Sequence, residues 1–273
     1  MKNNLTIVPL TTSLGAEIRG VNLAELQLED VTDFVDLLNL HKVLFFPDQS
    51  LTVDQHVAFG ALFGELQGHP HYENPITKHE QIFELAASHG GVADEWHSDI
   101  SFKPSPALYS ILKMVKCPAI GGDTLWTNPE AAYEALTPPL RALGDGLSAL
   151  HTAEAHGRPE VMAVHPVVRV HPDTGKRSLF VNEHFTKRLV EMSIEESNYW
   201  LTYLTRWIGK TRFSVRYRWQ AGTIAMWDNR CTQHKVLNDF DEERIIQRVT
   251  VMGDRPEGRQ TKWPVYTSNL NAS

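Results

Sequence analysis

The chain has 273 residues, of which 42% are hydrophobic, and its formal net charge is -7. This is enough apolar material for a sizeable core, and one domain over residues 1–273 is the default expectation. The 26 basic residues are scattered along the chain, which argues against a nucleic-acid partner, although a few converging arginines can still bind a small anion.

The two cysteines and the lack of long apolar runs bear on the compartment. Cys117 and Cys231 are far apart and form no CxxC pair, so two free thiols in a reducing compartment are expected. Residues 1–10 contain no apolar run of signal-peptide length, and no later stretch approaches the ~20 apolar residues that cross a bilayer. The sequence therefore predicts a cytoplasmic protein with no membrane partner.

The first half of the chain mixes predicted helices with short strands. Val43–Phe46 is an apolar run closed by Pro47, which is typical of a buried strand that ends in a turn. Thr52 and Gln55 have the spacing of a capping box, which predicts that a helix begins there. The other predicted elements are a helix over 31–38, strands over 82–85 and 108–112, and a helix over 129–136 after the N-cap Asn128.

The middle of the chain contains a predicted hairpin and a predicted helix. Residues 167–170 and 178–181 are β-prone and flank the turn-forming residues 171–175, so the two runs are expected to pair. Ser193 and Glu196 have capping-box spacing and predict a helix that continues to Ile208 with amphipathic spacing.

The last third is the clearest β region. Apolar and polar residues alternate from Phe213 to Trp219, which is the period of a half-buried strand, and further strands are expected over 223–227 and 244–252. Because strands dominate the middle and the end, with helices before and between them, a β sandwich or barrel decorated by helices is favoured over a βαβ array.

Trp96-His97-Ser98-Asp99 is the first segment that can carry chemistry. Residues two apart in an extended segment point to the same side, so His97 and Asp99 can converge on one ion. His234 follows a predicted strand, and antiparallel pairing can bring it to the same point. Two imidazoles and one carboxylate form a facial triad, which leaves positions open for a co-substrate and dioxygen.

The HxD pair is a weak motif by itself, because histidine and aspartate are common in turns and on surfaces. Spacing alone does not choose among the other histidines that could bind a metal: His69, His71, His89, His151, His165 and His171.

Arg244 and Arg248 are four residues apart in a β-branched segment that favours a strand, so both are expected on one side of it. If the apolar residues between them pack outward, both guanidinium groups face the interior. A buried guanidinium requires an anion, and its planar fork suits a carboxylate or sulfonate. The alternative is a salt bridge to a nearby acidic residue: Asp239, Asp241 or Glu242.

Taken together, these motifs resemble the taurine/phenoxyacetate dioxygenase (TauD/TfdA-like) family of Fe(II)/2-oxoglutarate-dependent dioxygenases. The resemblance runs from Leu14 to Pro256 and rests on these segments in order: Trp96–Asp99, Gly121–Trp126, Trp227–His234, Arg244 and Arg248. It implies a mainly β protein with flanking helices, built on a double-stranded β-helix (a jelly roll, cupin-like).

The resemblance also implies roles for individual residues. His97, Asp99 and His234 are expected to bind Fe(II) and to form the catalytic centre. Thr124 and Arg244 are expected to bind the carboxylate of 2-oxoglutarate that is remote from the metal. The expected substrate-binding residues are His69, Tyr72, Ile100, Phe185 and Arg248.

The implied reaction uses O2 to hydroxylate a small organic anion (a sulfonate, sulfate ester or aryloxy-carboxylate) and releases succinate and CO2. Asp99 favours hydroxylation, because a small residue there would open a halide site. Ala93 and Ala153 stand where taurine enzymes carry polar and aromatic contacts, which suggests a roomier and more apolar pocket. The family also favours a homo-oligomer, either a dimer or a tetramer.

Two other functions compete with this one. A zinc-dependent hydrolase could use the same two imidazoles and carboxylate, but it gives the arginines no role, and the chain has no HExxH motif. A non-catalytic jelly-roll protein that binds a small molecule could keep the site as a relic, but the intact set of Thr124, Arg244 and the three ligands speaks against it.

Overall fold

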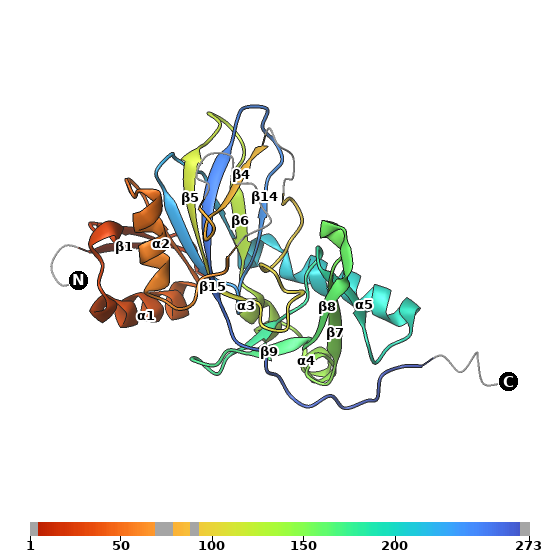
Figure 1. The fold of residues 1–273 in the computed structure, drawn as a ribbon. Helices are drawn as coiled ribbons and strands as arrows, with labels where there is room; N and C mark the ends of the chain where they lie inside the picture. The colour runs from red at the N-terminus through yellow and green to blue at the C-terminus, as the bar shows by residue number, and fades with distance from the viewer. Residues whose placement is uncertain (1–4, 69–78, 88–92, 268–273) are drawn as a thin grey trace.

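The computed structural model describes residues 5–68, 79–87 and 93–267 (Figure 1). Its largest sheet has seven strands in the order β1-β2-β3-β13-β5-β15-β4. Neighbouring strands run antiparallel, except that β2 and β3 run parallel. In chain order the strands are β1 (Thr6–Pro9), β2 (Ala16–Arg19), β3 (Val43–Phe46), β4 (Phe83–Ala86), β5 (Ala107–Lys116), β13 (Ile224–Asp228) and β15 (Ile245–Met252).

A second, smaller sheet faces the first one. It has the order β12-β6-β14 and consists of β6 (Thr124–Thr127), β12 (Ser214–Tyr217) and β14 (Gln233–Val236). Residues of both sheets share one apolar cluster, in which the rings of Phe45 and Trp126 meet edge to face with centroids 5.1 Å apart. Because the side chains form a common layer, the two sheets pack face to face, as the predicted jelly roll requires.

Helices cover the other face of the large sheet. Helices α1 (Val31–His41) and α2 (Val53–Ala61) lie on the same side of it (Figure 1). Phe34 of α1 and Phe59 of α2 share an apolar cluster with Ile111 of β5 and Val249 of β15. Strand periodicity therefore turns the neighbouring residue Arg248 towards the smaller sheet, which is the inward orientation predicted for it.

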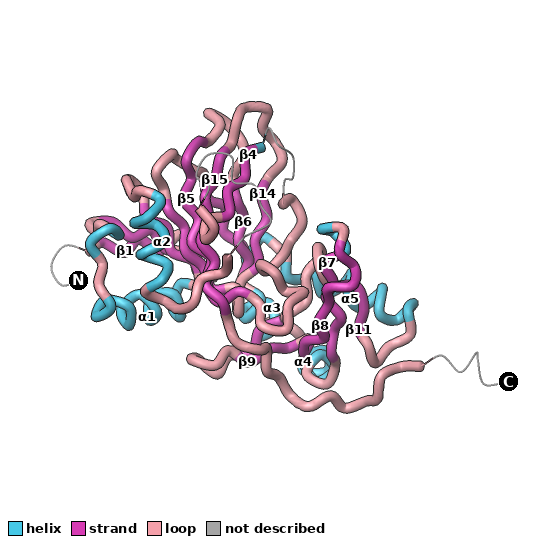
Figure 2. Tube along the Cα trace, viewed as in Figure 1, coloured by secondary structure: helices cyan, strands magenta, loops and turns pink. Residues whose placement is uncertain are grey.

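A third region has a core of its own. Strands β7 (Ser148–Ala153), β8 (Arg158–Pro166) and β11 (Thr186–Leu189) form a sheet in the order β11-β7-β8, seen beside α5 in Figure 2. The remaining elements are the hairpin of β9 (Val168–Val170) and β10 (Arg177–Leu179), and the helices α3 (Pro129–Glu134), α4 (Pro138–Gly144) and α5 (Ile194–Ile208). Leu201 and Leu204 of α5 pack against Leu189 of β11 in this core.

Most elements predicted from the sequence are present. Thr52 and Ser193 are N-caps with complete capping boxes, and Asn128 accepts a hydrogen bond from the backbone N–H of Ala131. The residues around the 171–175 turn form the expected hairpin. Predicted boundaries at the last strand differ by one residue, because Arg244 precedes β15. Among the strands and α-helices of the described residues, those that were not predicted are β1, β2, β6, β7, β8, β11, β14 and α4.

Two expectations about the whole chain can be compared with the structure. Both cysteines are free, as predicted. Within the described ranges, no helix combines the length and the apolar character that a membrane crossing needs.

Candidate metal and co-substrate site

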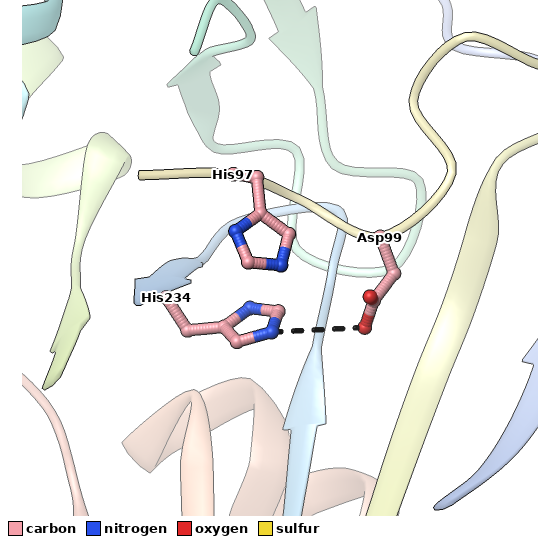
Figure 3. Close-up of side chains that lie close together, drawn as sticks. All are labelled: His97, Asp99 and His234. Atoms are coloured by element: carbon pink, nitrogen blue, oxygen red, sulfur yellow. Dashed lines mark ion pairs between the residues drawn. The ribbon is translucent and has the colours of Figure 1, made fainter. Parts of the chain in front are cut away.

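The three predicted metal ligands meet at one point (Figure 3). The backbones of His97 and His234 pair as an antiparallel bridge, in which each N–H donates to the carbonyl of the other, at 3.1 and 2.9 Å. His234 Nε2 lies 3.9 Å from Asp99 Oδ2, and one possible ligand atom from each residue lies within 4.8 Å of the others. The antiparallel pairing expected from the sequence therefore assembles the set.

The charges of these residues suit a cation. Burial lowers the pKa of both His97 and His234. Burial would raise the pKa of Asp99, but Arg248 and the two imidazoles outweigh it and hold that pKa well below its usual range. His97 Nδ1 lies 2.8 Å from the carbonyl oxygen of Glu95, so its Nε2 is the nitrogen left for a ligand. Two neutral imidazoles and one carboxylate fit a divalent first-row metal.

Both carboxylate oxygens of Asp99 have protein partners. Ser110 Oγ donates to Oδ2 at 2.6 Å, and Arg248 donates from Nη1 to Oδ1 at 2.5 Å. Arg248 is therefore not an unpaired buried cation, so its burial alone does not require an anion from the substrate. This corrects one argument for its role, although the guanidinium still lies beside the candidate metal site.

Arg244 is buried and forms no ion pair among the described residues; burial lowers its pKa to about 10, although the carboxylate of Asp123 acts in the opposite direction. The salt bridges considered from the sequence, to Asp239, Asp241 or Glu242, are not formed by Arg244. Its Nε donates to the Gly122 carbonyl at 3.1 Å, and its Nη2 lies 3.4 Å from Thr124 Oγ1. The guanidinium thus keeps free donors beside the hydroxyl with which it was expected to act.

Strand register connects Thr124 to the metal ligands. Trp126 pairs with His234 across β6 and β14, and Thr124 is two residues before Trp126 on the same face of β6. Two residues along a strand span about 7 Å. A dicarboxylate of five carbons can therefore extend from the His234 side of the site to the Thr124 and Arg244 side.

The predicted substrate residues fall into two groups. Phe185 is buried, and its ring centroid lies 6.2 Å from that of His97. Ile100 packs against the apolar cluster that contains Phe185. His69 and Tyr72 lie outside the described residues. Ala153 is fully buried in one apolar cluster with Phe102 and Phe185.

A second cluster of possible ligands has a different character. His171, Asp228 and Cys231 are also close enough to share an ion. However, Arg230 donates to both oxygens of Asp228, at 2.7 to 3.0 Å, and His171 Nε2 lies 3.0 Å from Oδ2. Burial raises the pKa of Cys231 well above its ordinary value, which keeps it a thiol. This cluster is therefore a satisfied ionic network and does not fit a metal.

Several residues at the site were not predicted from the sequence. Ser110 and Asn229 contact Asp99. The ring centroids of His184 and His97 lie 5.8 Å apart, and His184 Nδ1 lies 2.7 Å from Glu95 Oε2. A usable signal existed for Ser110, because it is a polar residue inside the otherwise mainly apolar segment 107–112 of the chain. The contacts of His184 depend on a loop far from His97 in the sequence and leave no such pattern.

Comparison with known proteins identifies the family. The profile of the family described as taurine catabolism dioxygenase TauD, TfdA family matches residues 6–250. The chain belongs to the TauD/TfdA family.

Two bacterial relatives share most of their length with it. An alpha-ketoglutarate-dependent sulfate ester dioxygenase from Pseudomonas putida is 37% identical, over 93% of this chain and 91% of the relative. An alkylsulfatase from Acinetobacter baylyi is 36% identical, over 93% and 87% respectively. A solved taurine dioxygenase from Burkholderia xenovorans superposes with a TM-score of 0.85 at 37% identity, covering 97% of this chain and 96% of that one. The predicted jelly-roll class and the predicted family are confirmed, and this TauD/TfdA protein is a dioxygenase and hence an oxidoreductase.

Proposed function

We propose that this TauD/TfdA protein is an Fe(II)- and 2-oxoglutarate-dependent dioxygenase that hydroxylates a small organic anion. The observation that carries the proposal is a facial triad together with a buried arginine, Arg244, that contacts Thr124. Thr124 lies two residues, or about 7 Å, along β6 from Trp126, which pairs with His234. The triad supplies the metal ligands, and the arginine supplies the counter-charge for a co-substrate. A solved relative, AAD-2, contains Mn(II) and N-oxalylglycine, and it covers 93% of this chain at 26% identity.

His97, Asp99 and His234 would hold the iron. The bound iron would supply oxygen activation coupled to the decarboxylation of 2-oxoglutarate, so that R–H, 2-oxoglutarate and O2 give R–OH, succinate and CO2. Neutral imidazoles leave the carboxylate as the one anionic ligand of the set, and the remaining positions stay open for the co-substrate and O2. Arg244 and Thr124 would bind the far carboxylate and fix the direction in which the co-substrate lies.

The substrate side combines a cation with aromatic walls. Arg248 lies beside Asp99, and Phe185, whose ring is close to His97, meets the ring of Phe102 edge to face with centroids 5.0 Å apart. An anionic head near Arg248 and an alkyl or aryl tail against the phenylalanines would hold a C–H bond towards the metal. This supports sulfate esters, sulfonates and aryloxy-carboxylates, and the names of the relatives from Pseudomonas putida and Acinetobacter baylyi favour sulfate esters. His69 and Tyr72 remain proposed contacts.

The test is substrate-dependent formation of succinate under air, with Fe(II) and 2-oxoglutarate. Medium-chain alkyl sulfates, alkylsulfonates, phenoxyacetates and taurine are compared with uncharged amide analogues. We expect stoichiometric succinate and O2 consumption with at least one anion class, and none when zinc replaces iron. Activity with zinc would support the hydrolase, and no succinate with any compound would support the non-catalytic binding protein. Equal rates with the neutral analogues would contradict the anion assignment.

We further propose that the protein acts in the cytoplasm as a homo-oligomer, either a dimer or a tetramer. The free cysteines support a reducing compartment, and the family resemblance supports the oligomer. Sedimentation analysis of the purified protein distinguishes the monomer, dimer and tetramer by mass.

A further inference from the structure

We propose that Ser110 and Asn229 are positioning residues that hold the carboxylate of Asp99 through a chain of hydrogen bonds starting at Trp227. The proposal rests on the proposed function only in that Asp99 binds the metal. The chain runs from Trp227 Nε1 to Asn229 Oδ1 at 3.1 Å, from Asn229 Nδ2 to Ser110 Oγ at 2.9 Å, and from Ser110 Oγ to Asp99 Oδ2 at 2.6 Å.

The direction of this chain is fixed by its first members. The indole N–H of Trp227 and the backbone N–H of Asp99 can only donate, and both lie 3.1 Å from Asn229 Oδ1. The amide NH2 of Asn229 therefore faces Ser110, where it donates to Oγ. Since Ser110 accepts this bond, its own hydroxyl proton is directed at Asp99 Oδ2. Each step leaves one orientation for the next side chain.

The chain connects the metal-ligand turn to the rigid centre of the large sheet. Ser110 of β5 pairs directly with Trp227 of β13, and the backbone N–H of Asn229 donates to Leu108 at 2.9 Å. Asp99, by contrast, lies in a turn. The next residue, Ile100, has a φ of 47°, which is an uncommon value for a β-branched side chain. Such a conformation persists only where the surroundings hold it, and Asn229 supplies that contact to the Asp99 backbone.

Water cannot easily replace the chain. Trp227, Asn229, Ser110 and Asp99 are each 0 to 3% exposed. When a buried donor is removed at such a site, the carboxylate loses a hydrogen bond that solvent does not restore. Among the described residues, the carboxylate would then keep only the hydrogen bond from Arg248 to Oδ1, which would let it rotate away from the His234 side. Loss of the chain should therefore weaken metal binding even though all three ligands remain.

Two substitutions test the chain by different routes. Ser110→Ala removes the hydroxyl. Asn229→Leu is close in size but has no polar atoms, so it removes the donor that directs the Ser110 hydroxyl proton at Asp99 Oδ2 without changing the charge. We expect either change to raise the dissociation constant for Co(II), followed by its visible absorption, by about 10- to 100-fold. The Co(II) spectrum should also change, because the carboxylate no longer holds one orientation.

Controls separate positioning from general damage to the fold. Thr250 pairs with Ser110 across β5 and β15, and its buried Oγ1 has no hydrogen-bond partner in the described structure. Thr250→Val is therefore a matched loss of a buried hydroxyl that should leave Co(II) affinity within about twofold of wild type. Ser110→Thr keeps the donor and should restore most of the affinity lost in Ser110→Ala. Urea unfolding of each metal-free variant reports whether it folds.

The outcomes decide between the two proposals. Wild-type Co(II) affinity in folded Ser110→Ala and Asn229→Leu would overturn the positioning role while leaving the dioxygenase assignment intact. If the wild-type protein and Asp99→Ala both fail to bind Co(II), the metal site itself is wrong, and the positioning role falls with it. If neither substitution yields folded protein, Ser110→Thr and Ser110→Cys give the answer, since affinity should follow hydrogen-bond donor strength, and equal affinity in both overturns the proposal.

Discussion

At the scale of single residues, Asp99 carries the charge of the proposed metal site. Replacing it with alanine leaves two neutral imidazoles and frees Arg248, a cation, beside them. Asp99→Ala should therefore abolish succinate formation under ordinary iron supply and remove measurable Co(II) binding. Asp94→Ala, an exposed aspartate in the same segment, is the matched control and should behave like the wild type. Full turnover by Asp99→Ala would rule out the facial triad as assigned.

Substitutions of the two arginines, Arg244 and Arg248, should affect the KM values of different substrates. Arg244→Gln replaces a charged fork with a neutral amide, so the KM for 2-oxoglutarate should rise by about 10- to 100-fold, the equivalent of a lost charge-assisted hydrogen bond. Arg248→Gln should raise the KM for the prime substrate and should also weaken metal binding, because Arg248 donates to Asp99, so the two variants are compared at saturating Fe(II). Arg244→Lys keeps the charge but not the planar fork, so its KM for 2-oxoglutarate should lie between those of the wild type and Arg244→Gln. The opposite split, with Arg244→Gln affecting only the prime substrate, would reverse the two assignments.

The sequence predicted the ligands better than it predicted their supports. His97 and Asp99 are close neighbours along the chain, and His234 follows a recognisable strand, so spacing and pairing rules could place them. Ser110 and Arg248 reach Asp99 from strands 11 and 149 residues away. No local pattern encodes such contacts, because they depend on register across β5 and β15. For the same reason the sequence argument offered only Asp239, Asp241 and Glu242 as protein partners of the arginines and did not consider Asp99.

At the scale of elements, one close approach sets the position of β15, the strand that carries Arg248. A methyl group at Gly60 of α2 would lie 2.6 Å from Val249 Cγ1. Gly60→Ala would ordinarily favour a helix by about 1 kcal/mol. Here it should lower the free energy of unfolding by about 1 to 3 kcal/mol, because α2 and β15 would have to separate.

A double-mutant cycle checks this contact. Val249→Ala alone should also destabilise the protein, because it leaves a cavity in the core. Combined with Gly60→Ala, it makes room for the new methyl group, so the two losses should not add, with a coupling of about 0.5 to 3 kcal/mol measured by urea unfolding. Strictly additive losses would show that the helix and the strand adjust independently.

Elements with local signals were predicted, and those defined by distant partners were not. The capping boxes at Thr52 and Ser193 predict the starts of α2 and α5, and the wholly apolar run Val43–Phe46 predicts β3. β1 is exposed along its whole length, and β14 follows a polar turn, so neither has the periodicity of a half-buried strand. These strands exist because a neighbouring strand supplies hydrogen bonds, which composition does not reveal.

At the scale of the whole molecule, the family and the jelly roll were within reach of the sequence because motifs occur in order along nearly all of it. One domain over residues 1–273 stays a prediction. Acid stability is a further property of the whole molecule, and it follows from histidines buried in the fold. Burial lowers the pKa of His56 and of His165 to about 4 and that of His151 to about 3.

These shifts fix the direction of the pH dependence. Between pH 6.5 and about 4, an unfolded chain protonates such a histidine, whereas the folded protein keeps it neutral. Stability is therefore complete above pH 6.5 and falls as the pH drops towards 4. His56 alone should account for about 3 kcal/mol of that loss at pH 4.

His56 allows this to be tested far from the metal site. Its Nε2 lies 3.0 Å from the carbonyl oxygen of Ile111, and a glutamine can still donate to that carbonyl without taking up a proton. His56→Gln should cost some stability at pH 7.5, through imperfect packing, yet lose less than the wild type between pH 7.5 and 4.5. Urea unfolding at several pH values measures how the free energy of unfolding of each protein changes with pH. A chelator is present, so that bound metal makes no contribution. The pH dependence of the free energy of unfolding should correspond to up to one bound proton fewer in the variant than in the wild type. An equal pH dependence in the two proteins would mean that His56 is already protonated in the folded protein.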